Sequence, residues 1–299
     1  MKDVALIRVV VASPSDVASE RETLSRVADE LNRTIGRAYD LRVEVNRWET
    51  DAHPGFHVEG PQGLIDPILR IEECDVFVGI FWKRFGTPVK GATSGTQHEF
   101  TKAYRCWKQQ GNPHIMFYFS KQPHTPSNSE ESTQWNEVKA FQQNFPAEGL
   151  WWSYGDPLEF ERQVRNHLTM YVLDRVKEVH DAEVIDESED DEDDEPLYDE
   201  TFSLERNLHM PFLCELEELD QINIDLTSDM PIDIMIFDKG DYRKWMRTGS
   251  VDTYYGHYEE REHLHAFFTA PEGGTYLVVV SNSSRAEADL QLTISYVRE

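Results

Sequence analysis

Residues 5–36, ALIRVVVASPSDVASERETLSRVADELNRTIG, decide the fold of the first part of this chain. The run ALIRVVVAS, residues 5–13, is a continuous β-branched stretch, which is typical of a strand buried on both faces of a parallel sheet. The residues that follow carry apolar side chains at helical spacing, with Ser15 as a candidate N-cap. The stretch therefore predicts a strand that leads directly into a helix.

The same alternation of strands and helices continues to residue 180. Because the strands are apolar and alternate strictly with helices, we expect an open parallel sheet of five strands with helices on both faces. For this α/β domain, residues 1–180, we predict the flavodoxin-like strand order 2-1-3-4-5. The further expected strands are 41–48 (LRVEVNRW), 75–82 (DVFVGIFW), 114–120 (HIMFYFS) and 150–154 (LWWSY); the further expected helices are 62–74, one ending at Gln110, 134–145 and one from Asp156.

An acidic segment, residues 181–200, divides the chain. Every residue from 189 to 195 is acidic, and the segment holds no basic side chain. Such a block repels itself and has little apolar surface to bury, so we expect an extended linker. The remaining residues, 201–299, alternate apolar and polar side chains in short runs separated by turn residues, which predicts an antiparallel β-sandwich.

The overall charge argues against several classes of partner. The chain has 29 basic and 56 acidic side chains and a formal net charge of −27, which opposes binding to nucleic acid or to an anionic membrane. A halophilic source would explain this acidity equally well. The three cysteines, Cys74, Cys106 and Cys214, suggest neither a disulfide framework nor a zinc site. We expect a cytoplasmic protein, because the apolar start is too short to span a membrane and has no signal-peptide layout.

The expected position of a ligand follows from the strand order. Ligands of open parallel sheets bind beyond the carboxyl ends of the strands, where the order reverses, which here means after the first and third strands. Both places carry polar and aromatic residues. We predict Glu99 as a catalytic residue, and Ser13, Ser15, Asp16, Trp48, Trp82, Arg84, Gly95 and Thr96 as substrate-binding residues.

Four blocks of the sequence also resemble a known family. VVVASPSDVASERETL, VNRWETDAHPGF, DVFVGIFWKRFGTP and SGTQHEFTKAY together resemble an uncharacterised bacterial and archaeal family related to Toll/interleukin-receptor (TIR) domains. That family is often attached to signalling or anti-phage NTPase modules. Its wider relatives include TIR domains that hydrolyse NAD and nucleoside 2-deoxyribosyltransferases, whose active-site glutamate lies in a Gly-Thr-x-x-Glu pattern. Gly95, Thr96 and Glu99 match that pattern. The resemblance implies cleavage of an N-glycosidic bond in NAD or a related nucleotide, without a cofactor, in anti-phage defence.

The residue types suit that chemistry. Breaking the bond between ribose C1′ and a base gives the sugar oxocarbenium character, which a carboxylate such as Glu99 can stabilise or attack. Gly95 lets the backbone approach a ligand, and Thr96 can cap the helix or hold a ribose hydroxyl. The other predicted contacts are phosphate at Ser13 and Ser15, pyrophosphate at Arg84 and ring stacking on Trp48 or Trp82.

Purely structural interpretations stand beside these functional ones. A glutamate near a helix start is favoured by the helix dipole, and Ser15 and Asp16 suit helix capping. Trp48 and Trp82 can seal the edge of the core instead of stacking on a ligand. Asp51, His53 and His57 lack the spacing of a metal site, so we expect no metal. The competing functions are a non-catalytic nucleotide-binding or TIR-type adaptor and a base-exchange transferase.

The second domain carries its own resemblance. FTAPEGGTYLVVVSN and ADLQLTISY resemble pre-peptidase C-terminal and GOLD-like sandwich modules, which implies binding or assembly rather than catalysis. TIR enzymes generally work as oligomers, so a homo-oligomer and a trigger or partner protein are expected. An aromatic group can form a recognition surface or pack in the core: Tyr242, Trp245, Tyr254, Tyr255 and Tyr258.

Overall fold

The computed structural model describes residues 4–47, 53–58, 60–89, 92, 94–186 and 196–297, with the backbone alone for 178–186. The chain forms two compact units, one of Met1–Gly36 with Asp40–His167 and the other of Arg37–Tyr39 with Leu168–Glu299. Of the segment expected to be a linker, residues 181–186 belong to helix α7 (Pro157–Asp186) and residues 198–200 to strand β6 (Tyr198–Leu204). The run of acidic residues from 189 to 195 lies outside the described residues. None of the described helices has the length and apolar character needed to cross a membrane.

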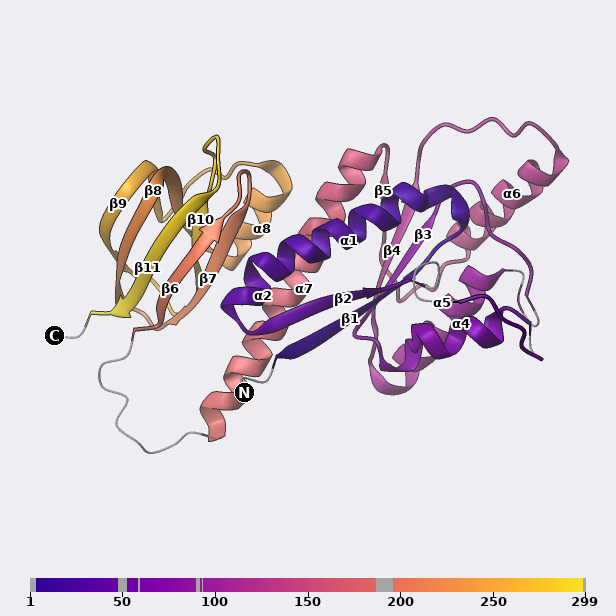
Figure 1. Ribbon diagram of the computed structural model, residues 1–299, viewed down its shortest axis with the longest axis horizontal. Coiled ribbons are helices and arrows are strands. Elements are labelled where there is room, and N and C mark those ends of the chain that lie inside the picture. The colour runs from indigo at the N-terminus through magenta and orange to yellow at the C-terminus, as the bar shows by residue number, and fades with distance from the viewer. Residues whose placement is uncertain are drawn as a thin grey trace. The chain divides into compact units, whose positions relative to one another are not determined.

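A five-stranded parallel sheet forms the centre of the first unit (Figure 1). Its strands are β1 (Ala5–Ala12), β2 (Leu41–Asn46), β3 (Val76–Phe81), β4 (His114–Ser120) and β5 (Trp151–Tyr154). The order is β2-β1-β3-β4-β5, with every neighbouring pair parallel, so the predicted flavodoxin-like order is confirmed. The order reverses at β1, which pairs with β2 on one edge and with β3 on the other.

Helices cover the two faces of this sheet. They are the short 3₁₀ turn Ser15–Val17, α1 (Ala18–Arg33), α2 (Ile35–Ala38), α4 (Gln62–Leu69), the 3₁₀ turn Ile71–Glu73, α5 (Gly95–Gln110), α6 (Ser129–Gln143) and the first part of α7. Alternate β4 residues face opposite helices, since Phe117 packs against Phe100 of α5 while Tyr118 packs against Phe160 of α7. The helix expected over 62–74 is interrupted, because Arg70 adopts a left-handed conformation (φ 46°) between α4 and the following 3₁₀ turn.

A cluster of phenylalanine rings fills the α5–α6 side of the sheet, and Gly79 of β3 makes room for it. A Cβ atom at Gly79 would lie 2.1 Å from Cε2 of Phe117. Phe117 in turn contacts Phe81, Phe100 and Phe141, so its ring has neighbours on several sides.

We therefore expect Gly79→Ala to lower the free energy of unfolding by about 2 kcal/mol, which is typical of overpacking a close-packed core. Urea unfolding checks this value. The double variant Gly79→Ala with Phe117→Leu should lose less than the sum of the two single variants, because the smaller side chain yields space. Additive losses would show that the ring of Phe117 is not the obstacle.

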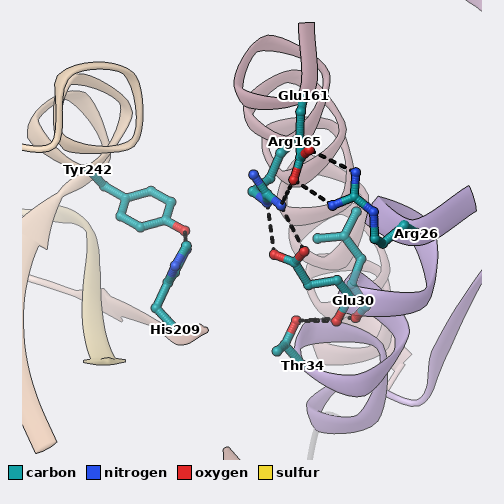
Figure 2. Close-up of polar contacts among 8 residues, drawn as sticks. Arg26, Glu30, Thr34, Glu161, Arg165, His209 and Tyr242 are labelled. Atoms are coloured by element: carbon teal, nitrogen blue, oxygen red, sulfur yellow. Dashed lines mark hydrogen bonds and ion pairs between the residues drawn. The ribbon is translucent and has the colours of Figure 1, made fainter. Parts of the chain in front are cut away.

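An ion-pair network joins α1 to α7 within the first unit (Figure 2). Glu161 of α7 accepts two hydrogen bonds from Arg26 of α1, both 2.8 Å. Arg165, one turn along α7, donates to both carboxylate oxygens of Glu30 at 2.8 and 3.0 Å and to Glu161 at 2.8 Å. Because each arginine meets a carboxylate in a paired geometry, the network fixes the register of the two helices.

The second unit is an antiparallel sheet that curls around one core. Its strands are β6, β7 (His209–Leu216), β8 (Gln221–Asp238), β9 (Gly256–Thr269), β10 (Gly274–Ser281) and β11 (Ala288–Tyr296), in the order β6-β11-β8-β10-β7 with β9 on the other edge of β8. The first half of β8 pairs with β11 and its second half with β10. β6 and β7 stand at opposite ends of this order, yet the rings of Phe202 and Phe212 lie 5.8 Å apart. The predicted antiparallel β-rich domain is thus confirmed.

Helix α8 (Lys239–Thr248) and its aromatic residues close one part of this core. Tyr242 is fully buried, and its hydroxyl lies 3.2 Å from Nε2 of His209 (Figure 2). Trp245 and Tyr254 both pack against Phe237 of β8. Core packing therefore accounts for Tyr242, whereas Tyr255 is exposed and Tyr258 half-buried.

Candidate functional site

Buried polar side chains gather at the carboxyl edge of the parallel sheet. In an alternating α/β unit each helix that follows a strand begins at this edge, so the first turns of α1, α4 and α5 lie there. Seven of the buried polar or charged side chains that the structure describes come from these turns, from the residues just before them and from the second turn of α5. They are Ser13, Glu20, Arg21, Gln62, Ser94, Thr96 and Glu99.

A buried arginine of α1 lies against the residues that follow β1. Arg21, only 7% exposed, donates from Nη1 to Ser13 Oγ and to the carbonyl oxygen of Pro14, both at 2.8 Å. The predicted phosphate contact Ser13 is therefore already hydrogen-bonded within the protein. Sequence analysis missed Arg21, although its spacing from Val17 and Leu24 puts it on the apolar side of the helix, where an arginine needs a polar partner.

The end of β5 is tied to the same helix. Tyr154, fully buried, donates to Glu20 Oε1 at 2.9 Å, and the other oxygen of Glu20 accepts from Ser19 Oγ at 2.7 Å. Burial, with the nearby charge of Glu20 as a second cause, raises the pKa of the Tyr154 hydroxyl. Sequence analysis missed this pair as well, because the two residues are far apart in the chain.

The loop after β3 is held by side chains from two other elements. Asp16 Oδ2 accepts from the backbone N–H groups of Lys83 and Arg84, each at 3.1 Å. Gln134 Oε1, from α6, accepts from the next two, Phe85 at 2.9 Å and Gly86 at 3.0 Å. Four consecutive amides are thus occupied. Asp16 therefore does more than cap a helix. Its second carboxylate oxygen, Oδ1, is buried without a hydrogen-bond partner among the described residues. Burial raises the pKa of this carboxyl, while the backbone N–H bonds lower it.

We expect Asp16→Ala to release this loop. Losing the acceptor leaves two amides without their partner, which should cost about 1–3 kcal/mol of unfolding free energy. Hydrogen exchange should become faster at residues 83 and 84, whereas Gln134→Ala should speed exchange at residues 85 and 86. Unchanged protection at 83 and 84 in Asp16→Ala would contradict this role.

Trp82 extends away from β1 towards the end of β4. Its Nε1 donates to the carbonyl oxygen of Gln122 at 3.1 Å, and its ring meets the ring of His124 edge-on. The ammonium group of Lys83 lies 4.1 Å from the centre of the same ring. Because β4 lies on the other side of β3 from β1, Trp82 contacts the β4 end of this edge, and ring stacking with a substrate there stays a prediction.

The start of α5 carries the predicted catalytic residue, Glu99, in its second turn. Ser94, fully buried, caps the helix by accepting from the N–H of Gln97 at 3.0 Å. Glu99 is only 3% exposed, and Thr96, three residues earlier on the same face, is also buried. Gly86 lets the loop after β3 pack closely against the start of α5. Its φ is +110°, and a Cβ atom at Gly86 would lie only 3.1 Å from the Cβ atom of Ser94. Glu99 is therefore held inside the protein at the predicted edge, not on the surface.

Helix α4 lines the other side of this turn. A Cβ at Gly95 would lie 3.4 Å from Gln62 Oε1, so the side chain of Gln62 borders the position that the glycine leaves open. Gln62 Nε2 donates to Asp66 Oδ1 at 2.7 Å, and Asp66 Oδ2 lies 3.3 Å from His98 Nε2. Lys102 lies 3.6 Å from the same oxygen of Asp66.

The remaining predicted residues lie on the surface or outside the residues that the structure describes. Ser15 and Arg84 are exposed, and only the backbone N–H of Arg84 has a contact described above. Trp48, and Asp51 of the rejected metal interpretation, lie outside the described residues. Within the described ranges, no three His, Cys, Asp or Glu side chains form a group that could hold a metal ion.

Comparisons with known proteins give one family and several distant structural likenesses. No curated protein matches the chain. Similar solved structures include the periplasmic g-type lysozyme inhibitor PliG of Aeromonas hydrophila (12% identity, 33% of this chain and 85% of that one, TM-score 0.28). They also include the pre-peptidase C-terminal domain of Bacillus anthracis collagenase (12%, 32% and 89%, 0.25) and apo elongation factor SelB of Methanococcus maripaludis (11%, 97% and 56%, 0.31). These TM-scores are too low to carry an inference about function. The model of the family described as "Domain of unknown function (DUF4062)" matches residues 9–169, more than half of the chain, and the chain belongs to this family.

Proposed function

We propose that the DUF4062 domain cleaves the N-glycosidic bond of NAD or a related nucleotide, with Glu99 as the carboxylate that faces the sugar. The observation that carries this proposal is the burial of Glu99, 3% exposed, in the second turn of α5. Buried ionisable groups cluster at functional sites, so the position of this carboxylate at the ligand-binding edge of a doubly wound sheet favours a chemical role.

The reaction makes use of such a group. As the bond from C1′ to the base breaks, positive charge develops on the sugar, and a carboxylate in a low-dielectric setting interacts with it more strongly than one in water. Glu99 either stabilises this charge or bonds to C1′ in a glycosyl-enzyme intermediate that water then hydrolyses. Thr96, on the same helix face, supplies a hydroxyl for the ribose.

The rest of the nucleotide then lies along the loops. The exposed side chain of Arg84 pairs with the pyrophosphate, and Ser15 lies near the start of α1, where anions are favoured. Trp48 remains our prediction for stacking on a ring. The resemblance to TIR domains supports a homo-oligomer in the cytoplasm that acts in anti-phage defence, with the second unit receiving a trigger or partner protein.

One observation favours a second candidate, a non-catalytic nucleotide-binding or signalling adaptor. Several polar groups at this edge already have partners within the protein: Ser13 binds Arg21, and the amides of residues 83–86 bind Asp16 and Gln134. Satisfied groups of this kind give a rigid frame without requiring turnover.

Incubation of the purified protein with NAD, NADP, ATP and deoxynucleosides, while released base is measured, separates these functions. Release of nicotinamide supports the hydrolase, and transfer of the sugar to an added second base supports the exchange transferase. Nucleotide binding without base release, in the presence of candidate triggers such as cyclic nucleotides, would support the adaptor and contradict the proposal.

A further inference from the structure

Strand β9 gives the sheet of the second unit an open edge. The strand order has β6 and β7 at its two ends, and these two strands are joined by side chains. Tyr198 of β6 donates its hydroxyl to the carbonyl oxygen of Leu213 on β7 at 2.6 Å, and Tyr296 of β11 donates to that of Glu215 at 2.9 Å. β9, by contrast, pairs with β8 on one side, and no other described strand pairs with it (Figure 1).

The backbone groups of alternate β9 residues point to this open side. In an antiparallel pair, two opposite residues either bond to each other or direct their N–H and C=O groups away from the partner strand. Gln221 of β8 lies opposite Thr269 but accepts from the N–H of Val297, just after β11, so this pair is of the second kind. The register is continuous from here to residue 263. Four residues therefore direct their backbone groups to the open side: His263, His265, Phe267 and Thr269.

The two halves of β9 differ in how well they are protected against pairing with another chain. Charged side chains and bulges are the usual protection of an edge strand. Every residue from 259 to 262 is charged, and the pairing with β8 shifts its register on both sides of Arg261. Residues 263–269, HLHAFFT, include no Asp, Glu, Lys, Arg or Pro, and their register is continuous. This half of the edge is suited to receiving a further strand.

We propose that residues 263–269 pair antiparallel with the same residues of a second copy of this chain, so that the two sheets become one. With the two-fold axis at Ala266, His265 lies opposite Phe267 of the second copy and His263 opposite Thr269. These are the four residues whose backbone groups point outwards, so each pair exchanges both of its hydrogen bonds. No outward N–H or C=O group of this stretch is then left without a partner.

The side chains match in the same register. On the core side, Ala266 and Phe268 are each 6% exposed and Leu264 is half-buried. The register sets Leu264 opposite Phe268 of the second copy and Ala266 opposite Ala266, so apolar side chains meet across the junction. On the outer side, Phe267, which is 53% exposed, meets the ring of His265. Each contact occurs twice because the two-fold axis relates the copies.

Charge favours this stretch as the place where two copies meet. The chain has a net charge of −27, so two copies repel each other over most of their surface. Residues 263–269 include no acidic side chain, and the neighbouring carboxylate of Asp225 is bonded to Nδ1 of His265 at 2.6 Å. This inference goes beyond the proposed glycosidase. It gives the expected homo-oligomer a defined surface and does not depend on catalysis by Glu99.

Sedimentation equilibrium of the full-length protein at several concentrations tests the pairing. We expect the wild type to form a dimer whose dissociation constant rises about 30-fold or more in Phe267→Lys, as is typical when an aromatic anchor is lost from an interface. Because Phe267 is exposed, this variant should keep the wild-type circular dichroism spectrum. The matched control is Leu158→Lys, which puts the same charge at a 78% exposed leucine of α7 and should dimerise like the wild type.

Cross-linking tests the register. Ala266 meets its own copy in a pair that is not hydrogen-bonded, and the Cα separation of such pairs suits a disulfide. Mild oxidation should therefore link Ala266→Cys into a covalent dimer. The wild type is the control, because its Cys74, Cys106 and Cys214 are buried and should not link.

The outcomes separate this inference from the proposed function. A monomeric wild type, a dimer that is as tight in Phe267→Lys as in the wild type, or an Ala266→Cys dimer that oxidation does not link would each overturn the pairing. Base release from NAD is measured with the same preparations. Pairing without base release would overturn the glycosidase and leave this inference standing, whereas base release by a monomer would do the reverse.

Discussion

Glu99→Gln is expected to lower base release by about 10³-fold or more, as is typical when an enzyme loses the group that meets the reacting centre. Glutamine keeps the shape of the side chain but neither attacks C1′ nor balances the positive charge of the sugar. Substrate affinity should change much less than turnover, because the charge appears only in the transition state. Initial rates of base release over a range of substrate concentrations check this expectation.

Folding must be excluded as the cause. Because Glu99 is buried, the thermal unfolding midpoint of the Glu99→Gln variant should be measured beside the rates. We expect this variant to remain folded. The matched control is Glu148→Gln, which removes a surface carboxylate paired with Lys108 at the far end of α5. That variant should keep wild-type turnover. Full activity in Glu99→Gln would remove this residue from the mechanism.

Glu161→Gln should cause a large loss of stability without touching the predicted site. Hydrogen bonds from Arg26, and further ones from Arg165, lower the pKa of Glu161 from 4.5 to about 2, against the opposing effect of burial. At about 1.4 kcal/mol per unit, this shift corresponds to about 3 kcal/mol before screening by solvent reduces it. The Glu161 side chain is 18% exposed, so we expect a loss nearer to about 2 kcal/mol.

The direction of the pKa shift determines how the stability contribution of Glu161 changes with pH. Because the folded pKa lies below the unfolded value, Glu161 binds fewer protons in the folded state than in the unfolded state between the two values. Its contribution is therefore fully present above pH 4.5 and is lost as the pH falls towards 2. The free-energy difference between wild type and Glu161→Gln, measured by urea unfolding, should shrink over that interval. A constant difference would contradict the shifted pKa.

Much of the fold could be predicted because it depends on local patterns. The uninterrupted apolar strands and the intervening helical periodicity of the first unit leave few topologies, and the order 2-1-3-4-5 is among them. The curl of the second unit could not be derived in the same way. It depends on β8, whose two halves pair with different strands, and a strand of alternating residues looks the same whichever neighbour it has.

The candidate site was predicted in its position but not in its contacts. Glu99 lies at the expected edge because a helix that follows a parallel strand must begin there. The hydrogen bonds that hold the loop after β3 could not be predicted. Only the tertiary fold brings Asp16 to the amides of Lys83 and Arg84, and Gln134 to the two amides that follow. Arg21 carried a detectable signal, a charge on the apolar face of a helix, whereas the bond between Glu20 and Tyr154 carried none.

The most direct test of the central claim is a crystal structure of Glu99→Gln with NAD or deoxyadenosine bound. We predict that the ribosyl C1′ will lie within about 3.5 Å of the side-chain amide of residue 99, the separation expected of reacting atoms. A nucleotide bound elsewhere, or residue 99 enclosed by protein atoms with no space for a sugar, would contradict the account.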